Sequence, residues 1–253
     1  MDIRHAFKGN VMSFISWKIL GVTLALLNPL IPTTHADVSI YPVKMHIQGE
    51  NGERTATLNM VASADQKAKN YEVKVFRWTQ DAQGQEVLTP DRSLVVNPLS
   101  FVLEPGSKRL IRMGFNQAVA DMGLKEEAAW RILINPLPDH EKFTGIQYAY
   151  AFSIPVFVGM KFKPNMSFQI AKNQENKATL IAKNQGQAHF QMTGLTLQNQ
   201  AGQTLKNLEQ MKYILANQQA IFNLNLPAFT STQGLKLLVH TADSKTIHFD
   251  LSE

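Results

Sequence analysis

Three basic residues stand inside segments that otherwise have the composition of β-strands. Lys44 lies in the stretch VSIYPVKMHI, Arg112 in KRLIRM and Arg131 in WRILIN. A cation among apolar strand residues costs free energy if it is buried without a partner. Each of these side chains can therefore face solvent, pair with an internal acid, or line a cleft that receives an anionic ligand. For Arg112 we expect an internal salt bridge, and for Lys44 and Arg131 the residues themselves leave these alternatives open.

The other side chains that could carry chemistry do not have catalytic spacing. The chain has seven histidines and no cysteine, and it contains no His-x-x-x-His pair or carboxylate cluster suited to a metal ion. It also lacks a Gly-x-Ser-x-Gly turn and a glycine-rich phosphate loop. Glu126 and Glu127 are adjacent, so in a strand they would point to opposite faces. We therefore expect no enzyme activity, no cofactor, no metal and no small-molecule substrate.

One segment alternates strictly between large apolar residues and small or polar ones. Ile146, Tyr148, Tyr150, Phe152 and Ile154 share one face of an extended strand, because side chains alternate with period two. The large face needs a partner, and the small face permits close packing. Such a strand is either an ordinary core strand or an edge strand that lends its bulky residues to another protein.

Strand-like segments separated by turn signals run through the chain. Residues 37–158 contain seven of them, at 38–47, 56–61, 71–78, 94–103, 108–115, 129–137 and 146–158. This pattern predicts an antiparallel sandwich of immunoglobulin type, with a loop or short helical turn at 117–127. Residues 159–164 are the expected linker, and 165–253 form a second, smaller β domain. The predicted fold is thus all-β, with two sandwich domains.

The N-terminal 36 residues have the features of a secretory signal peptide. Arg4, Lys8 and Lys18 precede an apolar run over 19–31, and small residues precede Ala36, after which we expect cleavage. The alternative is a membrane anchor, but the run is shorter than the ~20 residues that span a bilayer. Because the segment has the features of a signal peptide, we expect export to the periplasm. The formal net charge of +5 is dispersed along the chain, so we expect no nucleic-acid partner.

Four segments together resemble the PapD-like periplasmic chaperones of the chaperone–usher pilus pathway. Residues 103–113 (LEPGSKRLIRM) resemble the family's Leu-x-Pro-Gly turn and the basic-apolar strand that follows it. Residues 36–44, 130–138 and 146–158 are similar to the family's first, sixth and seventh strands. The second domain is similar only in size, position and strand pattern. The aromatic-Arg pair in the sixth strand looks like the archaic branch of the family.

This resemblance implies both a fold and a mechanism. Members of the family have two immunoglobulin-like domains set at an angle, in an L shape. They serve fimbrium biogenesis and cell wall organisation by binding pilus subunits that lack their last strand, and they deliver these subunits to an outer-membrane usher. The seventh strand, about 145–158 here, would complete the subunit by donor-strand complementation through Ile146, Tyr148, Tyr150, Phe152 and Ile154. Self-association of the unbound form is a further option.

The resemblance also implies roles for individual residues. Lys44 matches the first-strand basic residue that holds the subunit's C-terminal carboxylate. The second anchor of the family, a lysine on the seventh strand, falls here on Pro155, and we expect Arg131 to replace it. Arg112 and Glu127 match positions that form a structural salt bridge. No role is implied for particular residues of the second domain.

Two other functions fit an exported two-sandwich chain. A secreted two-domain pilus subunit or adhesin should carry an alternating extension ahead of its first strand, but here that strand begins within two residues of the expected cut. A carbohydrate-binding or enzymatic protein would need an aromatic platform or an acid pair. Trp78 and Trp130 are the only tryptophans after residue 36, and their strands suggest core or cleft positions.

Overall fold

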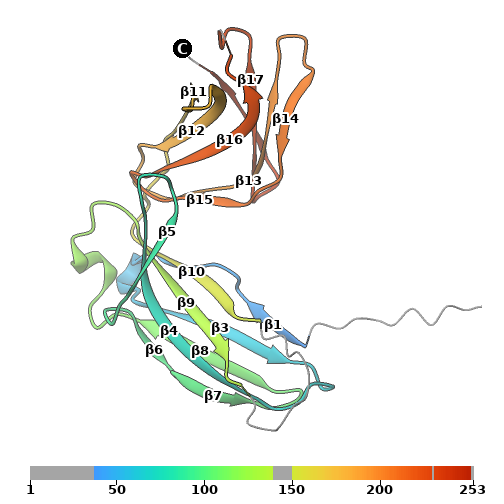
Figure 1. The fold of residues 1–253 in the computed structure, drawn as a ribbon. Coiled ribbons are helices and arrows are strands. Elements are labelled where there is room, and N and C mark those ends of the chain that lie inside the picture. Colours follow the sequence, from blue (N-terminus) through green and yellow to red (C-terminus); the bar gives the residue numbers. More distant parts are fainter. Residues whose placement is uncertain (1–36, 139–149, 230, 252–253) are drawn as a thin grey trace, which may run out of the picture. The chain divides into compact units, whose positions relative to one another are not determined.

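The computed structural model describes residues 37–138, 150–229 and 231–251. The expected signal peptide therefore lies outside the described residues. From Asp37 onward the chain forms one compact unit, built from strands (Figure 1). Within the described ranges, no helix is both long and apolar enough to cross a membrane. The prediction of an all-β, two-sandwich chain is confirmed.

Two sheets enclose the core of the first sandwich. One sheet has the order β1-β3-β8-β6, and the other has the order β2-β10-β9-β4-β5, with β7 also paired to β4. The strands are β1 (Val38–Tyr41), β2 (Met45–Ile47), β3 (Thr55–Ala62), β4 (Lys69–Gln80), β5 (Glu86–Pro90), β6 (Val95–Asn97), β7 (Ser100–Leu103), β8 (Lys108–Gly114), β9 (Ala128–Pro136) and β10 (Phe152–Val158). Alternating side chains fill the core between the two sheets, including Leu58, Ile111, Ile132 and Val156.

Two short 3-10 turns connect elements of the first sandwich, η1 (Glu50–Gly52) and η2 (Val119–Met122). The second lies in the segment 117–127, where a loop or a short helical turn was expected. The η2 turn ends at Gly123, whose φ of 63° is left-handed, a conformation that glycine adopts without steric cost.

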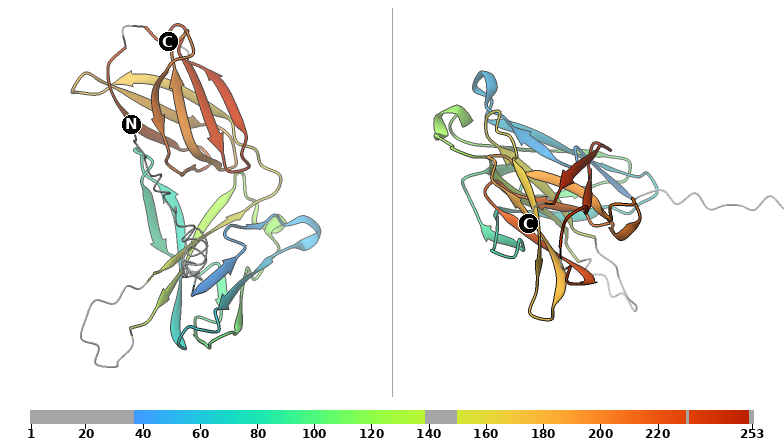
Figure 2. Two further views of the ribbon diagram at one scale, coloured as in Figure 1. Left: turned by 90° about the vertical axis from the view of Figure 1, so that its right-hand side faces the viewer. Right: turned by 90° about the horizontal axis from the view of Figure 1, so that it is seen from above.

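The second sandwich has its own core between two further sheets, of order β11-β12-β16 and β14-β13-β17-β18, with β15 also paired to β13. Figure 2 shows these sheets from two further sides. The strands are β11 (Met166–Lys172), β12 (Lys177–Asn184), β13 (Phe190–Gln198), β14 (Thr204–Leu208), β15 (Lys212–Ile214), β16 (Gln219–Pro227), β17 (Lys236–Thr241) and β18 (Thr246–Asp250).

Two expected strands are each divided in the structure. The segment 38–47 forms β1 and β2, which belong to different sheets and are separated by Pro42, and 94–103 forms β6 and β7, separated by Pro98. Both prolines follow cis peptide bonds. Proline cannot donate a ladder hydrogen bond, so it is tolerated where a strand ends or changes partner. The division of the first strand determines which part of β10 is paired on that side, because β2, but not β1, lies beside β10.

A third cluster of buried side chains joins residues of both sandwiches. Trp78, Ala129 and Phe157 come from the sheet that contains β10, and Tyr213 and Leu215 come from the second sandwich. Gln80, also buried, donates a hydrogen bond to the Tyr213 carbonyl (2.9 Å) and accepts one from the Leu215 N–H (2.8 Å). These polar groups are satisfied across the contact, so their burial costs little.

Candidate functional site: an open strand edge beside two cations

Strand β10 is paired along only part of one of its edges. On one side it runs antiparallel to β9 over its whole length, from Phe152 opposite Ile134 to Val158 opposite Ala128. On the other side it pairs with β2 only from Val156 onward. Within the described ranges, 152–155 therefore have a strand on one side alone. An edge of this kind presents backbone groups that another chain can pair with.

The course of the first strand explains why this edge is open. β2 runs parallel to β10 with Met45 opposite Val156, whereas β1 pairs with β3 in the other sheet. The chain therefore leaves the side of β10 at Lys44. Beside this departure Val43 is 72% exposed and Tyr41 48% exposed. Exposed apolar side chains next to an unpaired edge are typical of a surface that binds another protein.

The apolar face of β10 continues from the core toward solvent. Val156 and Val158 are fully buried and Ile154 is 5% exposed. Phe152 is half-buried against the same core, and Tyr150, two residues earlier, is 77% exposed. The prediction that Ile154 is available to a partner needs correction, because this side chain already fills the chain's own core. Tyr150 and Phe152 remain as described donor residues, and Ile146 and Tyr148 lie outside the described residues.

Lys44 and Arg131 lie on either side of Pro155. Pro155 is opposite Arg131 on β9, and Lys44 directly precedes Met45, the partner of Val156. Two strand spacings, about 9–10 Å, thus separate the two backbones. Both side chains reach the second sandwich, where their contacts, Gln191 and Tyr213, are themselves register partners on β13 and β15. The structure therefore brings the two predicted anchors into one region.

Arg131 is largely enclosed and its charge is compensated. Its side chain is only 11% exposed and its Nη2 forms an ion pair with Glu86. The guanidinium carbon lies 3.8 Å from the centre of the Trp78 ring and 5.6 Å from that of Tyr213, within the range of cation–π attraction. Burial raises the pKa of Tyr213, an effect that Arg131 partly offsets. The buried Arg131 Nε–H has no acceptor among the described residues.

Lys44 has a neutral partner instead. Its Nζ donates a hydrogen bond of 3.0 Å to the Gln191 side-chain oxygen, and the ion pairs of the described residues do not include it. Lys44 and Gln191 line a pocket of about 330 Å³ together with His189, Asp243 and Lys245. Asp243 is already bound by Lys245, whose hydrogen bond, with that of Thr241, lowers the pKa of Asp243 to about 2. The ammonium of Lys44 thus keeps an uncompensated charge next to the open edge.

The expected salt bridge between Arg112 and Glu127 does not form. Glu127 binds His189 instead, through Nδ1 at 2.6 Å and the backbone N–H at 3.0 Å, and the His189 ring stacks on Phe157 at 3.5 Å. Arg112 lies on β8, in the other sheet of the sandwich. The sheet order separates the two residues, which the sequence alone could not show. Glu127 therefore joins the two sandwiches, and Arg112 has no part in that contact.

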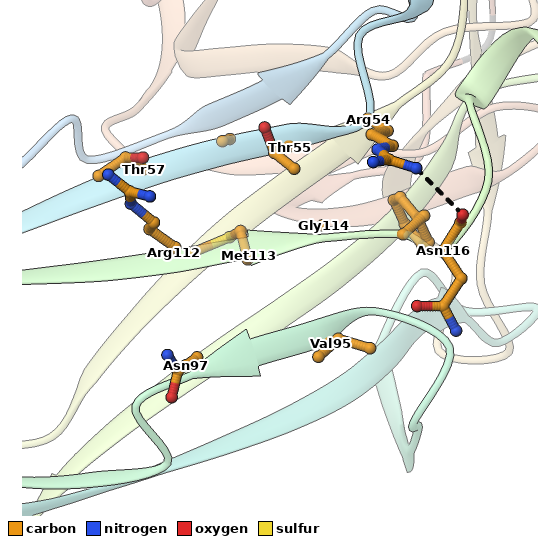
Figure 3. A pocket seen from close by; sticks show the side chains of 11 residues that line it. Arg54, Thr55, Thr57, Val95, Asn97, Arg112, Met113, Gly114 and Asn116 are labelled. Carbon is orange, nitrogen blue, oxygen red and sulfur yellow. Dashed lines mark hydrogen bonds between the residues drawn. The ribbon is translucent and has the colours of Figure 1, made fainter.

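Arg112 faces a polar pocket of about 440 Å³ on the outer side of its sheet (Figure 3). Thr57 and Asn97 flank it there, because both are its register partners. At the other end of the pocket Arg54 donates a hydrogen bond to the Asn116 carbonyl. This pocket lies on the sheet that does not contain β10, so it is separate from the open edge.

Three residues of the site escaped prediction from the sequence. Glu86, Gln191 and Tyr213 contact the two cations from distant parts of the chain, and Gln191 is 147 positions from Lys44. They lie in strands of ordinary composition and carry no motif. No signal in one sequence could have found them. Among the described residues, no group of histidines and carboxylates could hold a metal ion.

Solved structures of pilus chaperones share this fold. A chain of the CsuC–CsuE chaperone–tip adhesion subunit complex, from the archaic Csu pili of Acinetobacter baumannii, matches with a TM-score of 0.64 and 17% identity, over 85% of this chain and 98% of that one. A chain of the Salmonella enterica SafA pilin–SafB chaperone complex matches with a TM-score of 0.56 and 14% identity, over 87% and 98%. The E. coli chaperone DraB matches with a TM-score of 0.56 and 15% identity, over 85% and 98%.

No protein-family model and no curated protein matches the sequence. At these identities the structural likeness shows the fold. The two-sandwich architecture is that of the PapD-like chaperones, as the sequence resemblance implied.

Proposed function

We propose that this protein is a periplasmic chaperone for pilus subunits. It binds a subunit that lacks its last strand, lends strand β10 to complete that sandwich, and delivers the complex to an outer-membrane usher. Release occurs when the strand of the next subunit replaces β10, so the cycle requires no nucleotide, cofactor or enzyme activity. The observation that carries the proposal is the half-paired edge of β10, with its apolar face running from the core into solvent.

The energetics of strand addition support this proposal. A strand inserted beside 152–155 would gain main-chain hydrogen bonds, which set its direction and register. Tyr150 and Phe152 would enter the subunit's open core, and each large apolar side chain that becomes fully buried contributes about 1.5–3 kcal/mol. Because Tyr150 is now 77% exposed, most of its apolar surface is available for this burial.

Lys44 is the proposed contact for the subunit's terminal carboxylate. It lies where β2 closes the edge of β10, so a strand filling the open part of the edge would end beside it. Its charge has no acidic partner within the described ranges. Arg131 has a lesser role in binding this carboxylate, because Glu86 already compensates its charge. Its Nε–H, which has no acceptor among the described residues, would be the donor.

Co-purification from the periplasm of the source cells tests this function. The wild type is compared with Tyr150→Asp and Lys44→Ala, and mass spectrometry identifies the proteins that travel with each. Leu99→Asp is the matched control, because Leu99 is also an exposed apolar residue (60%) but precedes β7 rather than β10.

We expect β-rich secreted subunits at one to one with the wild type and with Leu99→Asp, and their loss with Tyr150→Asp. Lys44→Ala should retain less of the same subunits. A wild type that travels alone would contradict the chaperone function. Equal recovery with Tyr150→Asp would contradict the assignment of β10 as the donated strand.

A further inference from the structure

Gln191, a residue of the second sandwich, holds the Lys44 side chain in place. It lies on β13, directly opposite Tyr213 of β15, and its side-chain oxygen accepts the Lys44 Nζ–H at 3.0 Å. Among the described residues, its amide nitrogen donates only to the Met211 sulfur, at 3.5 Å, and sulfur is a weak acceptor. The hydrogen bond to Lys44 is therefore the main polar interaction of this side chain.

A neutral acceptor has a particular consequence for the ammonium group. A carboxylate in the same place would neutralise Lys44, as Glu86 does for Arg131. The amide oxygen fixes the direction of the flexible lysine stem and leaves its charge intact. An ammonium has three N–H donors, so two remain for an incoming anion. The pocket that Lys44 and Gln191 line has room for such a group.

We infer that Gln191 is a positioning residue for the carboxylate anchor. It would hold the Lys44 ammonium toward the end of an inserted strand, so that the second sandwich sets the geometry of a site whose cation comes from the first. This inference rests on the proposed function, because the anion is the C-terminal carboxylate of a bound subunit. A held cation binds an anion better than a free one, because less side-chain freedom is lost on binding.

The test compares two forms of the subunit recovered in the co-purification described above. One form has its native C-terminus, and the other carries two additional glycines, which displace the carboxylate by up to about 7 Å. The dissociation constants of both forms are measured with the wild type, Gln191→Met and Gln191→Glu. Gln169→Met and Gln169→Glu are matched controls, because Gln169 is exposed on β11. The ratio of the two constants is informative, since a general loss of stability would weaken both forms alike.

For the wild type we expect the native terminus to bind about tenfold more tightly, as for one hydrogen bond to a charged group. Gln191→Met should reduce this preference to about twofold, and Gln191→Glu should abolish it. The Gln169 controls should keep the wild-type ratio. Addition of salt should lower the wild-type preference, because part of it is electrostatic.

Three results would overturn the inference, and they are distinguishable. If Gln191→Met keeps the tenfold preference, Gln191 does not position Lys44, although the proposed function stands. If the wild type binds both termini equally, the carboxylate anchor itself is absent. If no subunit is recovered, or the wild type binds neither form, strand donation fails and the inference fails with it.

Discussion

Lys44 and Arg131 look equivalent in the sequence, but they have opposite environments. Arg131 is paired with Glu86 and covered by aromatic rings, whereas Lys44 is held by a neutral amide. A cation that is already paired and enclosed has little charge left for a ligand, whereas removal of one partner of such a pair destabilises the fold. Mutations of the two predicted anchors should therefore have different effects, on stability for Arg131 and on subunit binding for Lys44.

Replacement of Arg131 should mainly affect stability. Arg131→Met removes the ion pair and the cation–π contact, leaving Glu86 without its partner, so we expect the free energy of unfolding to fall by about 1–3 kcal/mol. Lys44→Met should change it by less than about 0.5 kcal/mol, while weakening subunit binding. Urea denaturation and binding measurements on both variants check this. A Lys44→Met variant that is the less stable of the two would refute the assignment.

Asp91 provides a stability effect that depends on pH. Its carboxylate accepts hydrogen bonds from the Ser93 hydroxyl (2.5 Å), the Trp130 Nε1–H (3.0 Å) and the Ser93 N–H (2.8 Å). Burial alone would raise the pKa of Asp91, but these bonds outweigh it and the pKa lies below its ordinary value. The stabilisation is therefore present above pH ~4 and is lost as the pH falls through the lowered pKa.

Asp91→Asn should consequently lower the free energy of unfolding by about 1–2 kcal/mol at pH 7. This difference from the wild type should shrink below pH 4, as the native carboxylate becomes protonated. Denaturation at pH 7 and pH 3 measures it, with the exposed Asp65→Asn as control. A difference that grows as the pH falls would contradict the hydrogen-bonding role.

At the level of elements, alternation predicted the strands with buried faces, and the exceptions have physical causes. β5, with the sequence EVLTP, has no buried residue, and β14 and β15 are also short, so the periodic signal was too weak to reveal them. The segment 38–47 was predicted as one strand because its apolar pattern continues across Pro42, although the chain changes sheets there. The positions of these strands depend on which strands pair in the folded protein, and this pairing is not visible in the local sequence pattern.

The candidate site shows the same limit of prediction. The apolar alternation of 146–154 and the cations were visible in the sequence, because both depend on local pattern. The pairing of Glu127 with His189 rather than Arg112, and the burial of Ile154, depend on which strands become neighbours. The partners of Lys44 and Arg131 lie far away in the chain, and a single sequence does not encode such contacts in a motif.

The hairpin between β4 and β5 contacts the second sandwich closely. A Cβ atom added at Gly84 would meet the Gln219 carbonyl oxygen and lie 2.8 Å from the Ala220 Cα. Gln219 also donates a hydrogen bond to the Ala82 carbonyl at 2.7 Å. This hairpin therefore packs against the start of β16, in the sheet of the second sandwich that does not contain Gln191 and Tyr213.

Gly84→Ala should lower the free energy of unfolding more than Gly52→Ala does. Both glycines have a left-handed φ, of 75° and 78°, but a Cβ at Gly52 meets no atom within 4 Å. The backbone strain is thus similar, and the excess of about 1–3 kcal/mol measures the overpacked contact. Thermal and urea denaturation of the two variants provide the comparison. Equal losses would show that the hairpin contact contributes nothing.

At the scale of the whole molecule, the sequence predicts cleavage after Ala36, which precedes the first strand of the fold, β1. The intact mass of the protein purified from the periplasm should therefore lack residues 1–36. A mass that retains them would show that the segment is an anchor, as the alternative interpretation of the N-terminus holds. A protein confined to the cytoplasm would contradict export.

Both sandwiches contribute residues to the proposed subunit-binding site. The first contributes the edge and the cation, and the second closes the region through Tyr213, His189 and Gln191. The polar pocket beside Arg112 lies on the sheet that does not contain β10 and is not part of this site. The proposed function requires that the open edge of β10 pairs with a strand of another protein.

Site-specific photo-cross-linking in living source cells detects this pairing directly. A photoreactive phenylalanine analogue replaces Tyr150 in one strain and Leu99 in another, and mass spectrometry identifies the cross-linked protein. We expect position 150 to capture secreted pilus subunits through their open core, and position 99 not to capture them. No cross-link at position 150, or the same products at both positions, would contradict this pairing.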